Sequence, residues 1–121
     1  MPQNKRKTGS AYENLAAKYL EDNGFKILER NFFCKFGEVD IIAQEDDYLC
    51  FIEVKYRKVA GSGNPFEAVD FRKQKKISSV FDYYIMTHPY MNKFQVRFDV
   101  VGILNTEISL IRNAFPYIGR M

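Results

Sequence analysis

The chain has 121 residues, of which 46% are hydrophobic and 27% are charged, a balance typical of one globular domain and not of a disordered segment. No apolar run approaches the roughly 20 residues of a membrane span, and no apolar stretch follows the basic N-terminus as in a signal peptide. Two cysteines and one histidine argue against a disulfide-stapled secreted fold and a Cys/His zinc site. We therefore expect a small cytoplasmic protein with no membrane partner.

The N-terminal segment is predicted to be a flexible arm followed by a helix. Residues 1–9 are polar and basic, a composition typical of a mobile terminus. Ser10 and Glu13 form a Ser-x-x-Glu capping box, the signature of a helix start. Apolar residues then recur at helical spacing up to Gly24, a typical C-terminal stop. We predict a helix over residues 11–23.

Three strands are expected next, because the following segments are rich in aromatic and β-branched residues. They are predicted over residues 25–31, 38–44 and 48–56. Residues 32–36 form a short aromatic connection between the first two strands, and the acidic residues 45–47 form a hairpin turn between the last two.

The second half of the chain is predicted to contain a loop, a helix and two more strands. The segments are a Gly-rich loop over 57–65, a short helical turn over 66–69, a helix over 71–87 capped by Asp70, and strands over 94–104 and 107–111. The order α-β-β-β-α-β-β predicts an α/β fold with one mixed sheet flanked by helices. Residues 10–121 are expected to form this single domain.

Charge is distributed unevenly along the chain. The net charge is only +3, yet residues 29–53 contain seven acids and two bases, and residues 55–76 contain seven bases and two acids. A solvated surface can have this pattern by chance. The same pattern suits a site that holds a cation and binds a polyanion such as nucleic acid.

A candidate catalytic site combines Asp40, Glu53 and Lys55. Side chains two apart on a strand share a face, so Glu53 and Lys55 point the same way. A two-residue turn at residues 46–47 would place Asp40 opposite Glu53, where two carboxylates repel unless a proton or cation lies between them. Two such ligands, with water and a phosphate, suit Mg²⁺ or Mn²⁺, and Lys55 could act on the phosphate or on water. The alternatives are a solvated charged face or a simple Glu53–Lys55 ion pair.

Several other charged residues have a functional and a structural interpretation. Glu13 closes the capping box, faces Asp40 as a further site residue, or does both. The basic residues of the second half are predicted to bind phosphates, the alternative being a solvated helix face. They are Arg57, Lys58, Arg72, Lys73 and Lys76. Arg97 and Asp99, two apart on a predicted strand, are expected to form a structural ion pair.

The pattern Asp…Glu-x-Lys on adjacent strands, behind a helix that carries a glutamate, resembles the PD-(D/E)XK nucleases of restriction-endonuclease-like fold. More narrowly, the chain resembles the YraN-like family of predicted endonucleases. The resemblance runs over nearly the whole chain. It depends on residues 9, 12–13, 16, 19–20, 24–25, 27–31, 37–43, 51–57, 67–69, 97–101 and 113–115.

The resemblance implies a restriction-endonuclease-like fold and a metal-dependent DNA endonuclease, with branched or recombination intermediates as conceivable substrates. It assigns metal binding to Asp40 and Glu53, the catalytic lysine to Lys55, and a first-helix glutamate to Glu13. It implies Mg²⁺ or Mn²⁺ as cofactor and DNA as partner, and nucleases that cut two strands often act as homodimers. The rival hypothesis is a non-catalytic module that keeps the nuclease fold and binds nucleic acid or a protein.

Overall fold

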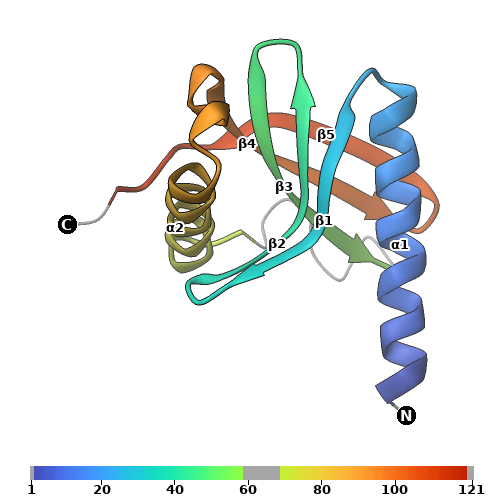
Figure 1. Ribbon diagram of the computed structural model, residues 1–121. Coiled ribbons are helices and arrows are strands. Elements are labelled where there is room, and N and C mark those ends of the chain that lie inside the picture. The colour runs from blue at the N-terminus through green and yellow to red at the C-terminus, as the bar shows by residue number, and fades with distance from the viewer. Residues whose placement is uncertain (1, 59–68, 120–121) are drawn as a thin grey trace.

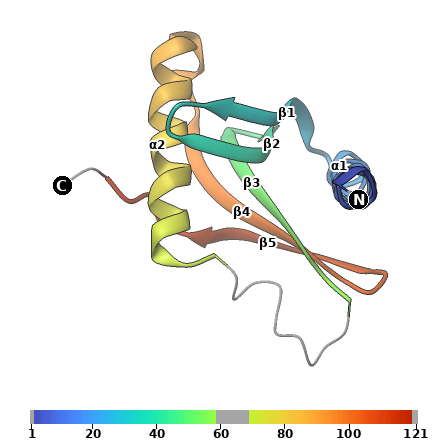
Figure 2. The ribbon, with the colours of Figure 1, turned by 90° about the horizontal axis from the view of Figure 1, so that it is seen from below.

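The computed structural model describes residues 2–58 and 69–119, with the backbone alone described for residues 2–10. A five-stranded sheet in the order β1-β2-β3-β4-β5 forms the middle layer. Figures 1 and 2 show helix α1 on one side of this sheet and helix α2 on the other. The β3–β4 pair is parallel and the other three pairs are antiparallel, so the predicted mixed sheet with flanking helices is confirmed.

Helix α1 (Pro2–Asp22) begins nine residues earlier than predicted. Proline suits the first helical position, and the Lys- and Arg-rich stretch that follows has good helix propensity. The predicted helix start at Ser10 is therefore wrong, because Ser10 lies inside the helix. The predicted end is confirmed: Gly24 has φ of +93°, and the Phe25 N–H donates to the Leu20 carbonyl at 3.0 Å, as in a Schellman motif.

Two hairpins form the first part of the sheet. Strand β1 (Lys26–Cys34) continues three residues beyond the predicted strand, so its turn to β2 (Gly37–Glu45) contains only two residues. Gly37 has φ of +143°, which favours glycine, and lies against Val80 of α2. Strand β3 (Tyr48–Arg57) follows the acidic turn as predicted.

The second part of the chain follows the predicted order. Helix α2 (Phe71–Thr87) has the predicted bounds, and the Asp70 side chain accepts a hydrogen bond from the Lys73 N–H at 2.9 Å. A 3₁₀ helix, η3 (Pro89–Lys93), was not predicted. Strands β4 (Gln95–Leu104) and β5 (Glu107–Phe115) form the last hairpin. The loop predicted over 57–65 and the turn over 66–69 lie mostly outside the described residues.

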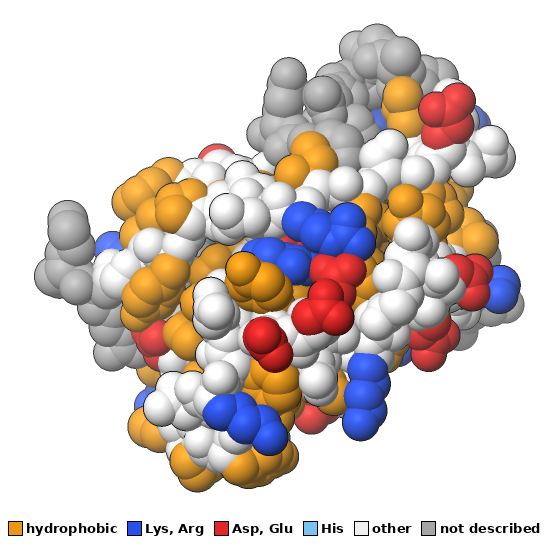
Figure 3. All heavy atoms as spheres, turned by 90° about the horizontal axis from the view of Figure 1, so that it is seen from above, with side chains coloured by type: hydrophobic (Ala, Val, Ile, Leu, Met, Phe, Trp, Pro, Cys, Tyr) orange, Lys and Arg blue, Asp and Glu red, His pale blue; other side chains and the backbone are white. Residues whose placement is uncertain are grey.

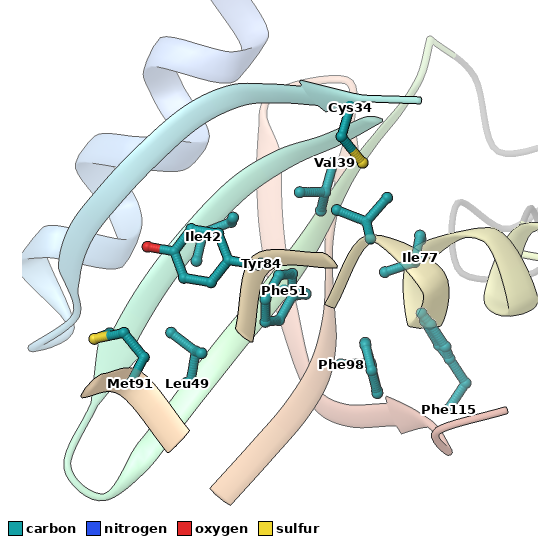
Figure 4. Packing of buried hydrophobic residues seen from close by; sticks show 11 residues of the cluster. Cys34, Val39, Ile42, Leu49, Phe51, Ile77, Tyr84, Met91, Phe98 and Phe115 are labelled. Atoms are coloured by element: carbon teal, nitrogen blue, oxygen red, sulfur yellow. The ribbon is translucent and has the colours of Figure 1, made fainter. Parts of the chain in front are cut away.

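Each helix covers one face of the sheet over its own apolar cluster. The cluster beneath α2 is aromatic: Phe51, fully buried on β3, packs edge-on against Phe81 and Tyr84 of α2 and contacts Phe98 of β4 (Figure 4). The cluster beneath α1 is mostly aliphatic, with Leu20 fully buried, and it also contains Phe25. The central strands β2, β3 and β4 are therefore buried on both faces, and a charged side chain there requires compensation. None of the helices in the described part of the chain is long and apolar enough to cross a membrane.

Candidate metal-binding active site

The site lies where strands β2 and β3 separate. Their pairing follows the predicted register from Glu45–Tyr48 as far as Ile41–Ile52 and then stops, one pair before Asp40 and Glu53 (Figure 2). The predicted direct pairing of these two acids is therefore wrong. Beyond this point, β3 stays paired with β4 alone up to Arg57.

Asp40 caps the end of the β2–β3 ladder. Its Oδ2 accepts a hydrogen bond from the backbone N–H of Val54 at 2.8 Å, a bond that a β2 carbonyl would make if the pairing continued. The carboxyl group thus lies in the gap between the two strands, next to Glu53. The two acids remain neighbours although they are not a ladder pair.

Burial and the neighbouring Glu53 carboxyl raise the pKa of Asp40 to about 8. The hydrogen bond from Val54 acts in the opposite direction, and the charge of Glu13 adds a smaller increase. Near neutral pH without a metal, the Asp40 carboxyl therefore keeps its proton, as expected of a carboxyl forced against another in a partly buried place.

Glu53 is a buried acid on an otherwise apolar strand. Only 4% of its surface is exposed, and its neighbours Ile52 and Phe51 are fully buried. Its Oε2 has no hydrogen-bond partner among the described residues. An unsatisfied carboxylate oxygen in such a place costs free energy, so its presence calls for a ligand or a functional reason.

Two lysines lie next to Glu53. Lys55 Nζ is 4.0 Å from Glu53 Oε2, which confirms that Glu53 and Lys55 share a strand face. Lys73 Nζ, from the first turn of α2, is closer, at 2.9 Å. The Lys73 contact has the distance of an ion pair, and Oε2 accepts no hydrogen bond that would satisfy it among the described residues. The sequence placed Lys73 in a phosphate-binding group, and the family resemblance placed it, with Gln74, where related nucleases carry a supporting polar residue.

Glu13 lies at the edge of the site. Because α1 begins at Pro2, Glu13 is not in the first turn and cannot close a capping box. Its Oε1 lies 3.9 Å from Nη2 of Arg30, and its charge affects Asp40. Among the described side chains, no group of three or more Asp, Glu, His or Cys residues is close enough to hold a metal ion. A role for Glu13 in metal binding stays a prediction.

The predicted phosphate-binding residues lie at the end of β3 and in the first half of α2. Arg57 ends β3 and donates from Nη1 to the Tyr56 carbonyl at 2.8 Å, and Lys58, which follows, is exposed. Arg72 and Lys76 are exposed in the first half of α2, the half that also carries Lys73. The structure thus gathers basic side chains on the part of α2 that borders the two acids.

A second charged cluster serves as an internal comparison. Figure 3, which views the end of the molecule at the β2–β3 turn, shows acidic and basic side chains side by side. There the buried Asp99 accepts hydrogen bonds from Arg97 at 2.9 Å and from the Asn113 N–H at 2.8 Å, and Arg97 and Arg112 both bind Glu45. The predicted Arg97–Asp99 ion pair is confirmed. Both Asp99 oxygens are satisfied, whereas Glu53 Oε2 is not.

The residues at the strand separation fit a hard divalent cation. Asp40 and Glu53 supply two carboxylates, and Glu53 Oε2 keeps a lone pair free of hydrogen bonds. Mg²⁺ and Mn²⁺ prefer such oxygen ligands, and Mg²⁺ commonly takes one or two carboxylates and fills its other positions with water and phosphate oxygens. The two acids could therefore hold the ion while its remaining ligands come from solvent and substrate.

Sequence comparisons extend over the part of the chain that carries this site. Residues 12–103 match the model of the uncharacterised protein family UPF0102. The chain belongs to this family. It is 44% identical to a UPF0102 protein of Lachnoclostridium phytofermentans over 116 residues. This aligned region covers 96% of this chain and 98% of the relative. It is 47% identical over 113 residues to one of Clostridium botulinum strain Loch Maree, covering 88% and 92%.

The match confirms the YraN-like resemblance, since UPF0102 is that family. Asp40, Glu53, Lys55 and Lys73 all fall within the matched residues. The names of these UPF0102 relatives state no activity.

Proposed function

We propose that this UPF0102 protein is a metal-dependent nuclease that hydrolyses phosphodiester bonds of DNA. The observation that supports the proposal most strongly is the buried Glu53 with its unsatisfied Oε2, set beside Asp40 and between two lysines. A structural acid is expected to look like Asp99, with every oxygen paired. Glu53 Oε2 instead contacts the two lysine ammonium groups and accepts no hydrogen bond among the described residues.

Each residue of the site has a separate role in the proposed hydrolysis. Asp40 and Glu53 would hold Mg²⁺ or Mn²⁺, which when bound polarises the phosphate and activates water. The Val54 N–H keeps the Asp40 carboxyl oriented. Lys55, on the same strand face as Glu53, would stabilise negative charge on the phosphate oxygens through its ammonium form, or take a proton from water through its uncharged form.

The rival hypothesis is a non-catalytic module that binds nucleic acid or a protein partner. A panel of cleavage assays distinguishes it from a nuclease. Linear, flapped and four-way DNA, together with other branched recombination intermediates, are incubated with Mg²⁺ or Mn²⁺. We expect metal-dependent cleavage of at least one substrate, lost on addition of a chelator. Tight DNA binding without cleavage of any substrate would favour the non-catalytic module.

DNA binding is expected to weaken steeply with salt, because each neutralised phosphate releases counterions. Changing Arg72 and Lys76 together to glutamine should reduce the slope of log affinity against log salt by about 2, since both side chains are exposed beside the site. Fluorescence anisotropy with labelled duplex DNA over a salt series measures this slope.

The matched control is Lys93→Gln, which removes one exposed charge from η3, at the far end of α2 (Figure 1). It should leave the slope near that of the wild type. An unchanged slope in the double variant would show that DNA does not bind along the first half of α2. Absence of binding even at low salt would exclude nucleic acid as the partner.

A further inference from the structure

Lys73 is held close to Glu53 by a fixed piece of backbone. Its own N–H donates at 2.9 Å to the side chain of Asp70, which is the N-cap of α2. From there its ammonium reaches to 2.9 Å from Glu53 Oε2, whereas that of Lys55 stays at 4.0 Å. Lys73 is therefore the nearest positive charge to Glu53 in the described part of the chain.

The ammonium group contacts the same oxygen that would bind a metal. Glu53 Oε2 is the buried atom without a hydrogen-bond partner, and Lys73 approaches it without completing a hydrogen bond. Lys73 and a divalent ion would therefore compete for one carboxylate oxygen. Two positive centres cannot share it closely, because like charges a few ångströms apart repel strongly in a partly buried place.

The Lys73 side chain can move away from Glu53. Its side chain is 38% exposed, so the ammonium can turn outward into solvent when the oxygen is taken by another ligand. Burial lowers the pKa of Lys73, but the carboxylates of Glu53, Asp40 and Glu38 outweigh burial and raise the pKa above its usual value. The ammonium group can meet a phosphate once it leaves Glu53.

We propose that Lys73 is the resident counter-cation of Glu53 in the metal-free protein, and that a divalent ion binds by displacing its ammonium group. The displaced lysine then becomes available to the phosphate backbone of the substrate. Lys73 is in this sense a positioning residue that sets the metal affinity. The inference rests on the proposed function, because it assumes that Asp40 and Glu53 bind the ion.

The test is calorimetric titration of Mn²⁺ into protein without DNA, so that activity plays no part. Lys73→Gln removes the competing charge and is expected to bind Mn²⁺ about tenfold more tightly than the wild type. Lys75→Gln makes the same change in net charge two residues away, on a different face of α2, and should leave the affinity unchanged. Lys73→Arg keeps a charge near Glu53 and should stay close to the wild type.

The outcomes distinguish failure of the Lys73 displacement proposal from failure of the metal site itself. Equal or weaker Mn²⁺ binding by Lys73→Gln, with binding by the wild type intact, would overturn the displacement proposal and leave the metal site standing. No Mn²⁺ binding by any variant would overturn the site itself. If Lys73→Gln folds only when Mn²⁺ is added, the ion replaces the lost cation and the proposal is supported. Failure to fold with and without Mn²⁺ would contradict it, because Lys73 would then be required for the fold.

Discussion

Changing Lys55 to alanine is expected to slow DNA cleavage by ~10²–10³-fold, because it removes a fixed cation from the place where negative charge develops. Lys55 lies on the strand face of Glu53, 4.0 Å from its Oε2, so its ammonium can reach a phosphate held by the two acids. Such a contact stabilises the transition state more than the ground state. DNA affinity should therefore change little.

Lys55→Arg distinguishes charge from proton transfer. Arginine keeps the positive charge but does not lose a proton in proteins, and its donors have a different geometry. Poor rescue by Lys55→Arg would indicate that the lysine takes a proton from water, and good rescue would indicate that charge alone is needed. Single-turnover cleavage of the best substrate from the panel measures all variants, with Lys93→Ala as the surface control.

If wild type, Lys55→Ala and Lys55→Arg cleave at the same rate, the observed nuclease activity belongs to another site or to a contaminant. If the wild type cleaves and Lys55→Ala has lost DNA binding as well, Lys55 acts in substrate binding and not in the chemical step. Circular dichroism of each variant confirms that the sheet is intact. Both outcomes are informative because Lys55 is only partly buried and its loss leaves no large cavity.

Asp40→Asn is expected to stabilise the metal-free protein at alkaline pH while abolishing tight metal binding. Asparagine can still accept the hydrogen bond from the Val54 N–H and carries no charge to repel Glu53. Without the second carboxylate, Mg²⁺ and Mn²⁺ lose one of two protein ligands, and cleavage should fall to background. Calorimetric titration and thermal unfolding, each with and without Mn²⁺, measure the two effects.

The raised pKa of Asp40 also predicts how the stability of the wild type changes with pH. The pKa of Asp40 is about 8 in the folded protein and near 3.8 when the side chain is free in water, so only the folded state binds this proton between those values. The free energy of unfolding of the wild type should then fall as pH rises through this window, by up to about 1.4 kcal/mol per pH unit. In Asp40→Asn this contribution disappears.

Measurements between about pH 5 and 8 avoid the acids that act in the opposite direction. The Arg112 guanidinium lowers the pKa of Glu45, so the stability from that pair is lost only below the usual range of a glutamate. Urea unfolding of wild type, Asp40→Asn and the exposed turn variant Asp47→Asn gives the comparison. The same pH slope in wild type and Asp40→Asn would show that the fold does not raise the pKa of Asp40.

Much of this fold was predictable because its signals are local. Asp70 and Pro89 mark the two ends of α2, and the apolar pattern between them sets its buried face. A two-residue acidic turn determines the register of β2 and β3 from Glu45 to Ile41. Continuing that register by one pair predicts that Asp40 lies beside Glu53, which makes the two acids candidate metal ligands.

Other element boundaries differ from the local signals that predicted them. The capping box at Ser10 is a valid local signal, yet α1 continues through it to Pro2. Strand β1 continues to Cys34 because β2 pairs with it as far as Gly37, and β5 continues to Phe115, which pairs with Phe98 of β4. In both hairpins, pairing with the neighbouring strand overrode the propensity of the segment itself.

The chemistry of the site depends most on long-range geometry. Strand β3 follows its parallel partner β4 to Arg57, while β2 leaves after Ile41, so the sheet opens beside Glu53. Asp40 caps this opening, and the crossover brings Lys73 of α2 to Glu53. Residue types and spacing along one hairpin predict which acids can meet. The strand separation and the helix that packs over it determine which oxygen stays free and which cation lies next to it.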